Sequence, residues 1–115
     1  MTDSPARFLD LCLDGADHQA LADWWCAAMG YQRHGDRGPD EPVLIVDPTE
    51  QGPNIWVNRV PERKTVKNRM HHDVTGDTDA LLALGAALLR RKDDEVHWDV
   101  LADPEGNEFC VFAPE

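Results

Sequence analysis

Apolar and polar residues alternate near the start of the chain and then change to helical spacing. From Phe8 to Asp14 a leucine stands at every second position, which predicts a half-buried strand. From Leu21 to Ala28 apolar residues recur three and four positions apart, which predicts an amphipathic helix ending near Gly30. The apolar runs Val43–Val46 and Ile55–Val60 follow and are predicted to be strands.

The second half of the sequence repeats this order. Residues 69–75 alternate as a strand, and the helical spacing that begins at Leu81 is predicted to stop at Gly85, the counterpart of Gly30. Strands are then expected at Val96–Ala102 and Asn107–Phe112. An Asp-Pro turn precedes the last strand of each half, Asp47-Pro48 in the first and Asp103-Pro104 in the second.

This repetition predicts two modules of order β-α-β-β-β, with residues 31–33 as a short strand of the first. Mostly antiparallel strands with helices on one face make an α+β fold. A length of 115 residues fits one domain, residues 1–115, with modules at about 6–62 and 66–115.

The charge of the chain excludes several classes of protein. Asp and Glu number 22 against 11 Lys and Arg, a net charge of -11, whereas binding nucleic acid or an anionic membrane requires a basic face. No apolar run approaches the ~20 residues of a membrane span. The first seven residues lack the apolar core of a signal peptide, and three cysteines without close pairing argue against disulfides. We therefore expect a cytoplasmic protein with buried, free cysteines.

Basic residues gather in one stretch, Arg59–Arg69, which holds five of the eleven Lys and Arg. Two interpretations stay open for this stretch. It is either a solvated loop or a rim that attracts an anionic ligand or an acidic surface of a second subunit.

Two stretches, Lys64–Asp73 and Trp98–Val111 with its Asp-Pro-Glu-Gly-Asn turn, give the chain a family resemblance. With the paired β-α-β-β-β order, the sequence resembles the vicinal oxygen chelate superfamily, which includes glyoxalase I, extradiol dioxygenases and bleomycin-binding proteins. It is most similar to the small glyoxalase-like branch. The resemblance implies a curved sheet around a cavity between the modules, with the helices outside.

The resemblance also implies where metal ligands would stand. Metal enzymes of this superfamily place them on the first and last strand of each module, positions that are Asp10, Trp56, His71 and Cys110 in this sequence. Tryptophan cannot ligate a metal, so we predict no tightly bound metal with four protein ligands, and no cofactor. The less favoured alternative is a divalent metal held by Asp10 and His71 together with Cys110 or Glu108.

Strand alternation and the resemblance together predict the polar lining of the cavity. His71, oriented by Asp73 or Glu108, is the predicted general base. His72 should instead pack with Met70 and Val74. The predicted ligand-binding residues are Asp10, Trp56, Asn58, Arg69, Trp98 and Cys110, although the sequence does not settle which face Trp98 occupies.

The resemblance, taken together with this lining, implies three functions. The first is a glyoxalase-like protein that binds or transforms a small organic molecule; as an enzyme it would be a lyase or isomerase using acid–base chemistry. The second is a drug- or metabolite-sequestering protein of the bleomycin-resistance type, and the third a metal-dependent lyase or dioxygenase. A small interaction module with a vestigial site is a further alternative. Both a monomer and a homodimer stay open.

Overall fold

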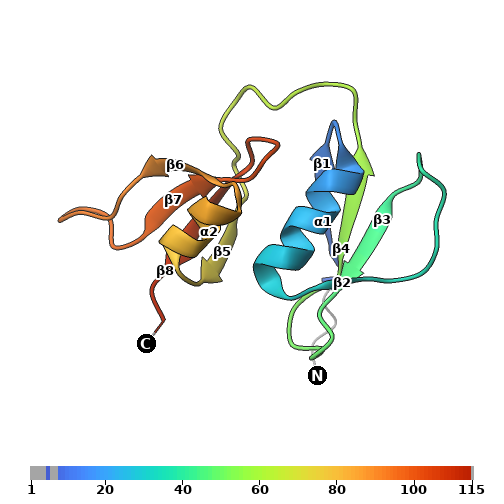
Figure 1. The fold of residues 1–115 in the computed structure, drawn as a ribbon, viewed down its shortest axis with the longest axis horizontal. Coiled ribbons are helices and arrows are strands. Elements are labelled where there is room, and N and C mark those ends of the chain that lie inside the picture. The colour runs from blue at the N-terminus through green and yellow to red at the C-terminus, as the bar shows by residue number, and fades with distance from the viewer. Residues whose placement is uncertain (1–4, 6–7, 115) are drawn as a thin grey trace. The chain divides into compact units, whose positions relative to one another are not determined.

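Two units with the same order of elements make up the structure, a computed structural model that describes residue 5 and residues 8–114. Unit 1 takes in the residues up to Asp14 together with His18–Arg59. Unit 2 takes in Gly15–Asp17 together with the chain from Val60 onward. Figure 1 shows one helix and one sheet in each. None of the helices in the described part of the chain is long and apolar enough to cross a membrane.

Unit 1 is built around one long amphipathic helix. Its elements are β1 (Leu11–Gly15), α1 (His18–Met29), β2 (Gln32–Arg33), β3 (Val43–Val46) and β4 (Ile55–Arg59). Leu21 and Trp25 of α1 are buried together with Ile45 and Val57 of the sheet. Burial of side chains this large is the main favourable term in folding, so these residues position the strands of the unit.

Unit 2 has a shorter helix and a smaller core. Its elements are β5 (His72–Thr75), α2 (Thr78–Leu84), β6 (Ala87–Arg90), β7 (Asp99–Ala102) and β8 (Glu108–Phe112). Leu81 of α2 is buried, as are Leu101, Phe109 and Val111 on the two central strands.

The sheets of the two units have equivalent strand orders, β1-β4-β3-β2 and β5-β8-β7-β6. In unit 2, β5 pairs with β8 in parallel, and the other strand pairs are antiparallel. The predicted α+β fold of two β-α-β-β-β modules is therefore confirmed. The prediction that both units form one domain stays a prediction.

The two Asp-Pro turns fold through their aspartates. The carboxylate of Asp47 accepts hydrogen bonds from the backbone N–H groups of Thr49 and Gly52. The carboxylate of Asp103 accepts them from the N–H groups of Glu105 and Asn107. A short acidic side chain that bonds nearby backbone donors fixes a turn, which explains why this residue recurs at both points.

Several strand boundaries differ from the prediction. The first strand begins at Leu11 rather than Phe8, and Leu9 is 85% exposed. The strand predicted from residue 69 begins at His72, so Met70 lies before the strand and its side chain does not follow the alternation of faces. Met70 is 80% exposed, and its assignment to the packed face was wrong. The structure also places β6, a strand to which we assigned no range, directly after α2.

The expectation that all three cysteines are buried was wrong. Cys12 is exposed and Cys26 is half-buried, and only Cys110 is buried. His18, the first residue of α1, is also buried, and its Nε2 donates to the carbonyl oxygen of Glu41 at 2.9 Å. A backbone carbonyl in reach offsets the cost of burying the imidazole.

Candidate functional site

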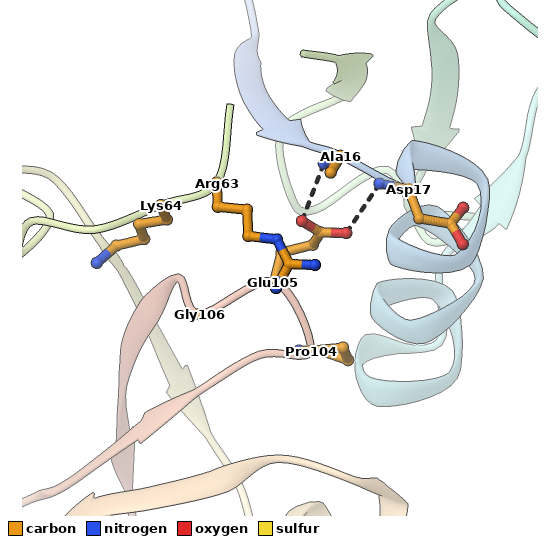
Figure 2. Close-up of a pocket in the computed structure, with 7 residues that line it drawn as sticks. All are labelled: Ala16, Asp17, Arg63, Lys64, Pro104, Glu105 and Gly106. Atoms are coloured by element: carbon orange, nitrogen blue, oxygen red, sulfur yellow. Dashed lines mark hydrogen bonds between the residues drawn. The ribbon is translucent and has the colours of Figure 1, made fainter. Parts of the chain in front are cut away.

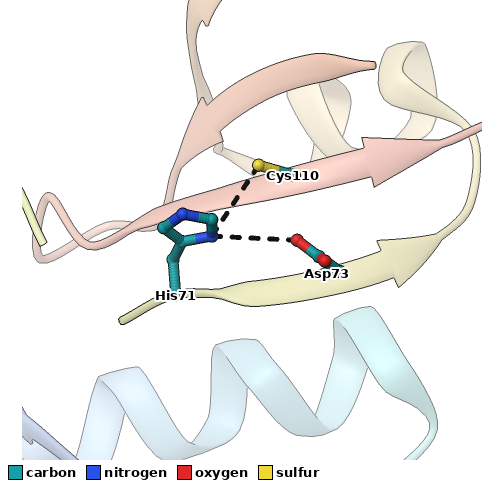
Figure 3. Close-up of side chains that lie close together, drawn as sticks. All are labelled: His71, Asp73 and Cys110. Carbon is teal, nitrogen blue, oxygen red and sulfur yellow. Dashed lines mark hydrogen bonds and ion pairs between the residues drawn. The ribbon is translucent and has the colours of Figure 1, made fainter. Parts of the chain in front are cut away.

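Three side chains that carry ionisable groups meet on one face of the unit 2 sheet. The Nδ1 atom of His71 lies 3.7 Å from Oδ1 of Asp73 and 3.8 Å from Sγ of Cys110 (Figure 3). Asp73 lies directly opposite Cys110 in the parallel pairing of β5 with β8. His71 stands two residues before Asp73, and residues two apart on an extended chain share a face.

Burial differs within this cluster. His71 and Asp73 reach solvent, with side chains 37% and 62% exposed, whereas Cys110 is only 7% exposed. Burial raises the pKa of the Cys110 thiol, the nearby carboxylate of Asp73 raises it further, and Lys67 opposes both effects. The cluster therefore joins a protonated, buried thiol to a solvent-accessible histidine and carboxylate.

Glu108 lies on the same strand as Cys110, but its carboxylate binds Lys64 and Asn68 rather than the side chains of the cluster. Its carboxylate pairs with Nζ of Lys64 and accepts the backbone N–H of Asn68 at 2.6 Å. Burial raises the pKa of Glu108, but the hydrogen bonds from Lys64 and Asn68 and the charge of Lys64 outweigh it and hold the pKa below its ordinary value. Of the two carboxylates proposed to orient His71, Asp73 is the one beside it.

Aromatic side chains border the cluster. The ring centroids of Trp98 and Phe112 are 5.6 Å apart. Phe112 stands two residues after Cys110 on β8, so Trp98 lies on the cluster's face of the sheet. Val100 pairs with Cys110 and adds an aliphatic neighbour.

The predicted residues of unit 1 form a separate group of polar pairs. The indole N–H of Trp56 donates to Oδ2 of Asp10 at 3.0 Å, and the guanidinium of Arg37 lies 4.8 Å from the centroid of the Trp56 ring. The amide of Asn58 donates to Asp14 at 3.3 Å. Arg37 could not be predicted from the sequence, because the identity of a loop residue does not show which aromatic ring it will contact.

Arg69, the remaining predicted binding residue, and His72, which was predicted to pack, are not part of the cluster. Arg69 is exposed and precedes β5. His72 pairs with Phe109 on the opposite face of the sheet from His71. Burial lowers the pKa of His72, although the charges of Asp103 and Asp73 act in the other direction.

A pocket of about 550 Å³ in unit 2 contains none of the predicted residues. Its lining includes Arg63, Lys64 and the Pro104–Gly106 turn (Figure 2). Both oxygens of Glu105 accept backbone N–H groups at 2.9 Å, those of Ala16 and Asp17. Since the carboxylate of Glu105 already accepts these two N–H groups, neither donor is available to a ligand. The basic stretch of the sequence had indicated Arg63 and Lys64 as candidates for binding an anionic ligand. No feature of the sequence indicated that Glu105 would accept the N–H groups of Ala16 and Asp17.

A family comparison decides what kind of domain carries these features. The sequence matches the family described as "Glyoxalase-like domain" over residues 10–112. The chain belongs to the glyoxalase-like domain family. The family and the structural neighbours confirm the resemblance to the vicinal oxygen chelate superfamily. No curated protein matches the sequence.

Solved structures of other proteins share the fold at low sequence identity. A glyoxalase/bleomycin resistance protein/dioxygenase family enzyme from Burkholderia phytofirmans PsJN is 19% identical, with a TM-score of 0.71, over 94% of this chain and 98% of that one. TnmS3, an antibiotic binding protein from Streptomyces sp. CB03234, is 15% identical, with a TM-score of 0.59, over 97% and 99%. At these identities the likeness shows the fold alone.

The metal positions implied by the superfamily can be tested on this glyoxalase-like domain. Trp56 offers no ligand atom, and its indole N–H occupies an oxygen of Asp10. Two of the four implied positions are thus a hydrogen-bonded Trp–Asp pair within unit 1. The four positions therefore do not fit the metal centre of the superfamily's metal enzymes.

Proposed function

We propose that this chain binds a small organic molecule on the face of the unit 2 sheet that carries His71, Asp73 and Cys110. The observation that carries the proposal is the meeting of these polar groups beside the aromatic pair of Trp98 and Phe112. Ligand sites usually combine apolar walls with a few fixed polar groups. Here the rings supply an apolar wall, and the imidazole and carboxylate supply a donor and an acceptor.

Drug or metabolite sequestration is the form of binding that we favour. A structural neighbour, TnmS3, is an antibiotic binding protein on the same fold. Sequestration requires only complementary contacts, and the buried, protonated thiol of Cys110 is suited to packing against a ligand rather than to nucleophilic attack.

A thermal-shift screen with antibiotics and aromatic metabolites tests this proposal. A ligand at 100 times its dissociation constant stabilises a protein by about 2.7 kcal/mol, which is readily detected. We expect His71→Ala to abolish the shift from any hit while leaving the melting temperature of the free protein nearly unchanged. His72→Ala, the matched control on the other face, should retain the shift. Binding that survives His71→Ala and Asp73→Asn would contradict the proposed site.

A second candidate function is acid–base catalysis, favoured by the 3.7 Å approach of Asp73 to Nδ1 of His71. A carboxylate beside one ring nitrogen orients the imidazole and leaves the other nitrogen to accept a proton from a ligand. A lyase or isomerase would use that proton transfer. Incubating each hit with the protein and following it by NMR distinguishes the two functions, because only an enzyme changes the ligand, and His71→Ala should stop that change.

We also propose a cytoplasmic location, which the three free cysteines support. A homodimer stays a proposal, to be tested by light scattering.

A further inference from the structure

The contacts described above do not explain the charge of the basic stretch Arg59–Arg69. This stretch holds five basic residues against one acidic residue, Glu62, so it carries a net charge of +4 in a chain of net charge -11. From its placement we infer that the ligand of the His71 face is an aromatic acid, whose anionic group is bound by Lys67. The inference rests on the proposed function and deepens it by naming the class of ligand.

Contacts with Glu108 hold part of this stretch against the start of β8. The Nζ atom of Lys64 forms an ion pair with one oxygen of the Glu108 carboxylate, and both side chains are largely buried. The other oxygen accepts the backbone N–H of Asn68 at 2.6 Å. Glu108 stands two residues before Cys110 on β8, so it lies on the face of the sheet that carries the cluster. Residues 64–68 are therefore fixed at their two ends beside this face.

Lys67 lies between these two fixed points. Its carbonyl carbon is bonded to the Asn68 nitrogen, so its backbone adjoins the Glu108 carboxylate. Its side chain is exposed, and none of the ion pairs among the described residues includes it. The positive charge of Lys67 acts to lower the pKa of the Glu108 carboxyl and of the Cys110 thiol, which agrees with an ammonium group near both.

The charges on this face favour an anion over a neutral or cationic ligand. The carboxylate of Glu108 is already compensated by its ion pair, and that of Asp73 lies 3.7 Å from the imidazole of His71. Lys67 has no such partner among the described residues, and Arg69 adds a second exposed cation two residues before His71. Because the excess of acidic residues in the chain repels anions, binding one requires a local group of cations such as this.

The aromatic pair indicates the rest of the ligand. The rings of Trp98 and Phe112 have centroids 5.6 Å apart and lie on the same face as Cys110. A flat aromatic body gains contact area and favourable ring geometry against such side chains. An aromatic acid supplies both features, a ring for this pair and an anionic group for Lys67.

Three naphthalene probes test the inference, because they share one ring system and differ in charge. Binding of naphthoate, naphthamide and naphthylmethylammonium to the full chain is measured by isothermal titration calorimetry at low ionic strength. We expect the carboxylate to bind at least about threefold more tightly than the amide, and the ammonium to bind most weakly. Added sodium chloride should reduce the advantage of the carboxylate, because salt screens exposed charges.

Matched variants assign the preference to Lys67. Lys67→Gln should weaken naphthoate binding at least about threefold and leave naphthamide binding unchanged. Lys92→Gln, the control, removes the same charge from another exposed residue and should change neither affinity. The backbone N–H of Lys92 binds Asp99, which alternates with Trp98 along the chain and so lies on the opposite face of the sheet.

The outcomes separate this inference from the proposed function. Naphthoate that does not bind, or binds no more tightly than naphthamide, would overturn the inference, as would equal effects of Lys67→Gln and Lys92→Gln. The proposed site would survive that result if His71→Ala still abolished binding of the amide. Naphthoate binding that persists in His71→Ala would contradict the proposed site, and the inference with it. A dimer that Lys67→Glu separates into monomers, with naphthoate affinity unchanged, would assign the basic stretch to a subunit interface instead.

Discussion

At the scale of single residues, two adjacent histidines have opposite environments. His71 is solvent-accessible beside Asp73 and Cys110, and His72 is half-buried on the opposite face, opposite Phe109. Alternation along the chain was sufficient to predict this separation. It could not show that Cys110 would reach His71, because that contact depends on the register between β5 and β8, two strands far apart in sequence.

The stability of the protein should depend on pH through His72. Burial lowers its folded-state pKa below the ordinary value of 6.5, so the unfolded chain binds more protons in the interval between the two values. The neutral, buried form of His72 therefore makes its full contribution to the free energy of unfolding above pH 6.5. That contribution is lost as the pH falls below 6.5. We expect the free energy of unfolding, measured with urea between about pH 5 and pH 8, to fall on acidification through this interval. His72→Gln should flatten that dependence and His71→Gln should retain it; equal profiles for wild type and His72→Gln would refute the assignment.

At the scale of elements, glycine determines where α2 ends and β6 begins. Apolar spacing alone would carry the helix past Leu88, yet the structure ends it at Leu84. Gly85 has a φ of 122°, a conformation unfavourable for residues with a Cβ atom, and its N–H donates to the carbonyl oxygens of Leu81 and Leu82. The comparison with Gly30 predicted this end correctly. The strand that follows could not be placed, because its residues fit both the helical and the extended pattern.

Gly85→Ala should therefore destabilise the protein by about 1–2 kcal/mol, the cost of a left-handed conformation for an L-residue. Gly76→Ala is the matched control: a Cβ there would lie 3.9 Å from Leu81, in ordinary contact, and no positive φ is imposed. The control should change stability little or increase it slightly. Urea unfolding of both variants gives the two values, and equal losses would show that the backbone conformation at Gly85 is not the cause.

At the scale of the whole molecule, the internal repetition of the sequence was the main basis for predicting the fold. Each half repeats a strand, a helix and an Asp-Pro turn, and both sheets have equivalent strand orders. The fold class follows from such patterns, since local spacing and turn chemistry agree along the whole chain. The candidate site could be predicted less completely from the sequence, because tertiary contacts determine which side chains pair. Glu108 illustrates the limit: its position on the last strand was predicted, but its pairing with Lys64 was not.

The excess of acidic residues should make the stability of the whole protein depend on salt. Eleven uncompensated negative charges repel one another in the folded chain, and salt screens that repulsion over distances beyond about 10 Å at 0.1 M. We expect the melting temperature to rise as sodium chloride is increased from low ionic strength to about 0.5 M, at constant pH. Asp36 and Asp94 are exposed and have no ion-pair partner among the described residues, so Asp36→Asn combined with Asp94→Asn should raise the melting temperature at low salt and weaken the response. A melting temperature that falls with added salt would mean that attractive ion pairs, such as Lys64 with Glu108, outweigh the net repulsion.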